Sequence, residues 1–147
     1  MAVGRWRRDV VDSVDTKTRS RIMSRIRAKN TRPEMLVRRL VFAAGYRYRL
    51  HMATLPGKPD LVFFRRRKVI FVHGCFWHLH RDCPRARMPK SRIDFWSTKL
   101  FGNRRRDEMQ LLALAEMGWQ VLTLWECELA DLDALGARIA AFLDDGA

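Results

Sequence analysis

The chain has 147 residues and carries 29 lysines and arginines against 16 aspartates and glutamates, a formal net charge of +13. This length suits one domain, and no apolar run approaches the ~20 residues that cross a bilayer, so we expect no membrane span. The arginine-rich start lacks the apolar core of a secretory signal, and the three cysteines are an odd number, so we expect a cytoplasmic protein without a disulfide framework.

Residues 1–17 are polar and basic without a sustained apolar period, and we expect a flexible basic arm ahead of a single folded domain over residues 18–147. The excess positive charge attracts a polyanion through phosphate contacts and counterion release, which makes nucleic acid the first candidate partner. A membrane surface and mere solubility are the alternatives. Absence of a basic amphipathic anchor with a broad apolar face favours nucleic acid.

Two helices are predicted next. Isolated apolar residues, Met23 among them, indicate a short helix over residues 19–29. Thr31 then fits the N-cap of a second helix, with a proline in the first turn and Glu34 placed to complete a capping box, and Gly45 ends it. This gives Glu34 a sufficient structural explanation. The predicted apolar face of the second helix comprises Met35, Leu36, Leu40, Val41 and Ala44.

Strands are predicted at residues 46–50, 61–64 and 68–72, and a turn at 55–59 aims Asp60 from the start of the middle strand. A Pro-Asp pair that opens a hairpin is how restriction-type nucleases present a magnesium ligand, although the dipeptide alone is weak evidence. Those nucleases then carry an acidic residue, one intervening residue and a lysine, whereas Ile70-Phe71-Val72 offers no charged side chain.

Three of the four histidines and two of the three cysteines lie between His73 and Cys83. Thiolate and imidazole donors at Cys75, His80 and Cys83 suit tetrahedral zinc, and Cys127 could supply a fourth ligand. The alternative is that the cysteines are small buried hydrophobic residues.

The remaining side chains of this segment have two readings each. His78 is not needed as a ligand, so it could act as a general base or acid, or it could be a hydrogen-bonded structural histidine. Phe76 and Trp77 could be wedges that enter between base pairs, or they could simply cover the metal.

A long helix is predicted over residues 91–117, followed by a buried strand at 119–125 and a closing helix at 131–143. One stripe of the long helix has the parts for entering a groove and reading base edges, namely Trp96, Lys99, Asn103 and Asp107. The alternative is a solvated face with an exposed tryptophan. Leu111, Leu112, Leu114 and Ala115 are expected to face the core. Strands separated by helices predict an α/β/α sandwich with a mixed sheet.

Several blocks of the sequence together resemble the very-short-patch repair (Vsr) DNA mismatch endonucleases. They are Pro56-Gly57-Lys58-Pro59-Asp60, His73-Gly74-Cys75-Phe76-Trp77-His78, Asp94-Phe95-Trp96, Gly102-Asn103, Arg106-Asp107, Gly118-Trp119 and Trp125-Glu126-Cys127. The resemblance runs from about Thr18 to Cys127. It implies a restriction-endonuclease-like fold with a structural zinc site, and a monomer that nicks DNA on the 5′ side of the thymine of a T:G mismatch.

The resemblance also implies residue roles. Magnesium would be held by Asp60 and the Val72 main-chain carbonyl, with Glu34 near it through water. His78, oriented by Asp107, would activate water, and His73 would assist near the phosphate or leaving group. The other implied roles are structural zinc at Cys75, His80, Cys83 and Cys127, and DNA contacts from Met23, Phe76, Trp77, Trp96, Lys99 and Asn103. A nuclease that cuts a fully paired site and a non-catalytic zinc-stabilised DNA-binding module are the alternative functions.

Overall fold

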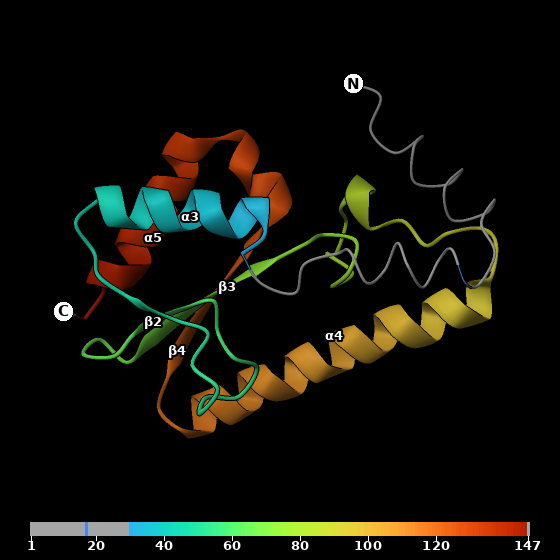
Figure 1. The fold of residues 1–147 in the computed structure, drawn as a ribbon, viewed down its shortest axis with the longest axis horizontal. Helices are drawn as coiled ribbons and strands as arrows, with labels where there is room; N and C mark the ends of the chain where they lie inside the picture. Colours follow the sequence, from blue (N-terminus) through green and yellow to red (C-terminus); the bar gives the residue numbers. More distant parts are fainter. Residues whose placement is uncertain (1–16, 18–29, 147) are drawn as a thin grey trace.

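The computed structural model describes residue 17 and residues 30–146, and places a mixed sheet between helices (Figure 1). The predicted arm, apart from Lys17, lies outside the described residues, as do Met23 and its predicted helix. The described elements are α3 (Arg32–Ala43), β1 (Arg49–Leu50), β2 (Leu61–Phe63), β3 (Lys68–His73), η1 (Pro84–Ala86), α4 (Ile93–Glu116), β4 (Gln120–Trp125), η2 (Glu126–Ala130) and α5 (Leu132–Asp144).

The sheet has the strand order β1-β2-β3-β4. The first two pairings are antiparallel, whereas β3 and β4 run parallel with Val72 opposite Leu124. Helix α4 connects β3 to β4 and returns the chain to the start of the sheet, so the two strands run in the same direction. Their C-terminal ends therefore lie side by side at one end of the sheet. The predicted mixed sheet is confirmed.

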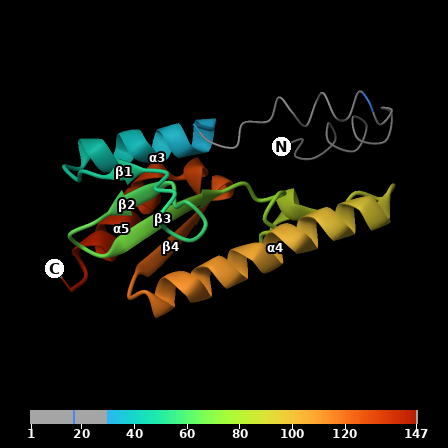
Figure 2. The same cartoon turned by 60° about the horizontal axis from the view of Figure 1, so that its bottom comes forward.

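Helices α3 and α5 cover one face of the sheet and α4 covers the other, as the two views show (Figures 1 and 2). Alternation along β3 supplies both cores: Ile70 packs with the buried residues of α3 and α5, while Val69 and Phe71 pack with Leu114 of α4 and with Trp119. The α/β/α arrangement therefore follows from a central strand that is apolar on both faces. None of the described helices is both long and apolar enough to cross a membrane.

Helix α3 begins where the sequence predicts. The Thr31 hydroxyl accepts a hydrogen bond from the Glu34 main-chain N–H at 3.4 Å, but the Glu34 carboxylate turns to other partners instead of completing the capping box. Val37 and Val41 are the fully buried residues of its apolar face, so the prediction omitted Val37 and wrongly included Ala44, which is exposed.

Three further expectations are corrected. The first strand is only two residues long, and the Tyr46 main-chain N–H before it donates to the Val41 carbonyl of α3 at 3.2 Å instead of to the sheet. Strand β4 is largely half-buried, since among the described strands it pairs with β3 alone. Leu112 is 67% exposed, so the apolar face of α4 is narrower than predicted.

Candidate active site and metal centre

Asp60 is placed by the turn that precedes β2. Gly57 has φ +77°, a backbone conformation that favours glycine, and the turn packs against Gln110 of α4 and Phe71. The Val72 main-chain N–H donates to Asp60 Oδ2 at 2.6 Å. Burial raises the pKa of Asp60 to about 7, opposed by that hydrogen bond. Because burial disfavours the charged form of the carboxylate, a nearby cation would stabilise it.

Glu34 lies beside Asp60, in a polar cluster whose other members, Arg38 and His51, were not predicted from the sequence. Glu34 is 2% exposed, its Oε1 contacts Arg38 Nη2, and it lies 2.6 Å from His51 Nε2. The other ring nitrogen, His51 Nδ1, is 3.8 Å from Asp60 Oδ1. His51 was the one histidine outside the predicted site. The backbone at His51 is left-handed, with φ 45°, which is uncommon for a residue other than glycine.

His78, His73 and Asp107 form the second group at the end of β3. His78 Nδ1 lies 2.5 Å from Asp107 Oδ2, and the rings of His73 and His78 stack with centroids 3.8 Å apart and an interplanar angle of 5°. Burial, together with the neighbouring His78, lowers the pKa of His73 to about 4, and Asp107 opposes the shift. His73 is therefore neutral near pH 7.

A cavity of about 380 Å³ opens beside this group, with His73, His78, Asp107 and Trp125 in its wall. Arg81, Arg104 and Glu108 also line it, and Arg104 Nε lies 3.8 Å from Glu108 Oε1. Asp60 lies at the same end of β3 as this group. Its carboxylate accepts a hydrogen bond from the main chain of Val72, and Val72 directly precedes His73. The two acid–base groups and the Asp60 carboxylate thus share one end of the sheet.

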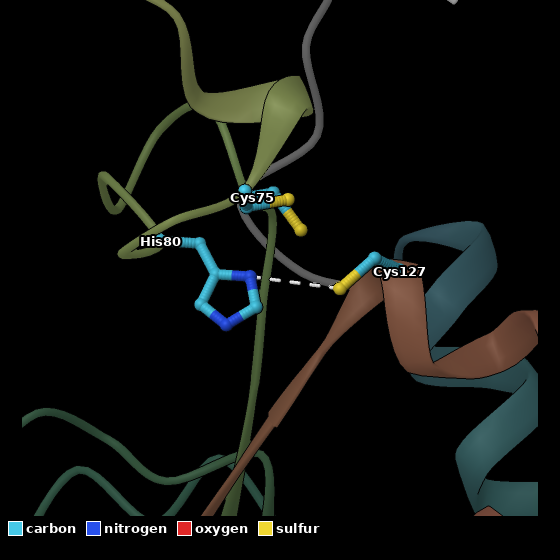
Figure 3. Close-up of side chains that lie close together, drawn as sticks. Cys75, His80 and Cys127 are labelled. Atoms are coloured by element: carbon cyan, nitrogen blue, oxygen red, sulfur yellow. Dashed lines mark hydrogen bonds between the residues drawn. The ribbon is translucent and has the colours of Figure 1, made fainter.

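The four predicted zinc ligands come together although Cys127 is 44 residues beyond Cys83 (127 − 83) in the sequence. The donor atoms of Cys75, His80, Cys83 and Cys127 all lie within 4.8 Å of one another. Cys127 Sγ is 3.5 Å from His80 Nδ1 across the gap between β4 and the loop (Figure 3). Donors on a tetrahedral zinc ion stand roughly 3.8 Å apart, so the set fits that metal.

Burial raises the pKa of Cys75 to about 12, and it also raises the pKa of Cys127. All three cysteines are free thiols. His80 is held in place by stacking on Trp125, with centroids 4.1 Å apart. Cys75 is buried, whereas Cys83 and Cys127 are half-buried. Zinc binds the thiolate form, so a bound ion would favour deprotonation of these thiols.

The predicted DNA-contacting aromatics form one cluster. The ring centroids of Phe76 and Trp77 lie 5.5 and 6.0 Å from that of Trp96. Trp96 is only 2% exposed, which contradicts the alternative of a solvated face with an exposed tryptophan. Asn103 Nδ2 donates to the Trp77 carbonyl at 3.1 Å, so in this state it fixes the loop.

Lys99 is exposed on α4, as expected for a groove contact. Met23 lies outside the described residues. Every other predicted site residue falls in one of the groups above, and Arg38 and His51 are the two members that sequence reasoning missed.

Comparison with known proteins gives a consistent result. The profile of a family described as DNA mismatch endonuclease Vsr matches residues 11–85. A type II nicking enzyme, V.XorIIP of Xanthomonas oryzae pv. oryzae, is 51% identical over 92% of this chain and 98% of its own. The DNA mismatch endonuclease Vsr of Escherichia coli K12 is 40% identical over 86% of this chain and 80% of its own. The type II nicking enzyme V.NmeAIP of Neisseria meningitidis is 42% identical over 82% of this chain and 85% of its own.

Proposed function

Because the chain belongs to the DNA mismatch endonuclease Vsr family and is therefore a DNA-nicking endonuclease, we propose that it nicks duplex DNA on the 5′ side of the thymine of a T:G mismatch. The reaction is magnesium-dependent hydrolysis of one phosphodiester bond. The observation that carries this proposal is the His78–Asp107 pair at the same end of the sheet as Asp60, whose side chain is only 15% exposed.

His78 is the general base. Asp107 engages Nδ1 at 2.5 Å, which holds the ring in the tautomer whose Nε2 accepts a proton from the attacking water. The stacked His73 ring fixes the plane of His78. Because its pKa is lowered to about 4, His73 stays neutral, and it serves as a hydrogen-bond donor near the phosphate or leaving group instead of a charged acid.

Asp60 and the Val72 carbonyl would hold magnesium. Hard cations take oxygen ligands and keep several waters, so one carboxylate and one carbonyl suffice beside phosphate oxygens. Burial raises the pKa of Asp60 to about 7, and a bound cation would stabilise its ionised form. When bound, the ion supplies charge neutralisation at the scissile phosphate.

The four-donor set at Cys75, His80, Cys83 and Cys127 would hold zinc in a structural role, since four protein ligands leave no open position for substrate. The site ties the loop that carries His78 to η2 after β4. This fixes the general base relative to the sheet.

Phe76 and Trp77 would open the base stack at the mismatch, where separating bases costs least. Trp96 packs behind both rings and Asn103 holds the Trp77 main chain, so the wedge is supported from α4. In this arrangement Trp96 is the base of the wedge instead of its tip.

The test that separates catalysis from binding uses Asp60→Asn. We expect this variant to bind a T:G duplex as the wild type does and to lose magnesium-dependent nicking. A non-catalytic DNA-binding module would show no magnesium-dependent nicking in the wild type either. Exposed Met109→Gln on α4 is the control, with nicking unchanged.

A further inference from the structure

Glu34, His51 and Asp60 have the ligand types and spacing of a divalent-cation site. One donor atom from each lies within 4.8 Å of the others. A guanidinium already sits inside this set: Arg38 Nη2 contacts Glu34 Oε1 and lies 2.9 Å from His51 Nε2. The cluster is therefore partly filled by a cation of the protein itself.

Arg38 is held firmly in this position. It stands four residues after Glu34 on α3, a spacing that brings the two side chains together. The two side chains are only 10% and 3% exposed, and Arg38 Nη2 also donates to Asn30 Oδ1 at 2.7 Å. A guanidinium keeps its proton in proteins, so its charge is permanent.

The atoms that Arg38 contacts are those that a metal would need at this end of the cluster. Glu34 Oε1 and His51 Nε2 lie 2.6 Å apart, and both face the same guanidinium nitrogen. A second divalent ion would meet a fixed positive charge at close range in a poorly solvated site, where repulsion is strong. Asp60 is bound instead through Val72 and faces the far nitrogen of His51.

We propose that Arg38 is a built-in cation of the active site that occupies the Glu34–His51 end of the cluster and keeps divalent ions at the Asp60 end. This inference rests on the proposed metal-dependent function. It makes Glu34 the partner of Arg38, with no direct bond to metal. His51 connects the two ends, and Arg38 is a positioning residue because it touches neither substrate nor the reacting atoms.

The test counts bound Mn²⁺ on the full chain without DNA, by paramagnetic resonance titration. Arg38→Met should bind one more ion than the wild type, and the double variant Arg38→Met/Glu34→Gln should lose that extra ion. Arg39→Met is the matched control, because it removes the same charge from the exposed face of the same helix. It should bind as many ions as the wild type.

A folded Arg38→Met protein that binds no more ions than the wild type would overturn the proposal. Should Arg38→Met fail to fold, the number of Mn²⁺ ions bound by the single variant Glu34→Gln decides. An unchanged ion count supports the proposal, and loss of one ion overturns it, because Glu34 would then be a metal ligand. Mismatch nicking by the wild type is assayed separately. If the wild type does not nick the mismatch but the variants bind the expected numbers of ions, only the proposed function is contradicted.

Discussion

Asp107 fixes one nitrogen of His78 at 2.5 Å while His73 covers the face of the same ring at 3.8 Å. Both neighbours restrict the imidazole to one orientation and one tautomer. The arrangement needs no charge on His73, whose pKa is lowered to about 4 by burial. In the proposed mechanism, this geometry preorganises His78 as the single proton acceptor.

Replacing His78 with Gln should lower the single-turnover rate of nicking by about 10²–10⁴-fold, the usual contribution of a positioned general base. Asp107→Asn should cause a smaller loss and change the pH profile, because it favours the wrong tautomer. Binding of a T:G duplex should be retained in both. A His78→Gln rate within about threefold of the wild type would remove His78 from the chemistry.

The pKa of Asp60 predicts how metal affinity depends on pH. Burial raises this pKa to about 7, so protons compete with the divalent ion below that pH. The apparent affinity for Mn²⁺ should rise roughly tenfold per pH unit below about 7 and level off above it. Calorimetric titrations at several pH values measure this. Asp60→Asn should abolish this component, and equal wild-type affinity at pH 5.5 and 8 would contradict the assignment.

At the scale of elements, the loop after β3 is held by donors from both of its ends and from η2, so its shape depends on the Cys75–His80–Cys83–Cys127 set. Loss of a structural metal is among the large destabilising changes, whereas trimming a half-buried thiol costs about 1 kcal/mol. Cys83→Ala should therefore lower the free energy of unfolding by more than about 4 kcal/mol and release zinc. Urea denaturation and metal analysis would show this. A small loss in a zinc-free wild type would mean that the cysteines are only packing residues.

The aromatic cluster of Phe76, Trp77 and Trp96 leads us to predict an effect on DNA binding. Stacking of a base on an aromatic side chain contributes about 1–3 kcal/mol, so Trp77→Ala should weaken binding to a T:G duplex by roughly 5–150-fold. Binding to the fully paired duplex should change little. Phe101→Ala, which removes a 55% exposed aromatic from α4, is the control. Equal weakening on both duplexes would contradict the wedge.

Elements with local signals were predictable from the sequence. Thr31 and Pro33 mark the start of α3, and the Pro-Gly turn marks the approach to Asp60, because caps and turns depend on a few adjacent residues. The short spacing of Cys75, His80 and Cys83 predicted their grouping for the same reason.

Features that depend on tertiary packing were not predictable. Arg38 and His51 meet only because α3 packs beside the segment after β1, and neither residue has a local signature. The burial of Trp96 depends on the Phe76–Trp77 loop folding back onto α4. Periodicity places a residue on a face of a helix, but it does not show what covers that face.

At the scale of the whole molecule, the candidate catalytic residues lie at one end of the α/β/α sandwich. The parallel β3–β4 pair delivers His73 and Trp125 side by side, and α4 contributes Asp107. The net charge of +13 attracts DNA without specifying sequence. In the proposed function, discrimination therefore comes from the aromatic wedge and from the residues proposed to face the groove.

The most direct test maps strand breaks in a duplex that carries one T:G pair and in the matched T:A duplex, with both strands labelled and magnesium present. We predict a single nick on the 5′ side of the mismatched thymine, in that strand only, and none in the T:A duplex. Equal cleavage of the two duplexes, or breaks in both strands, would contradict a mismatch-directed nickase.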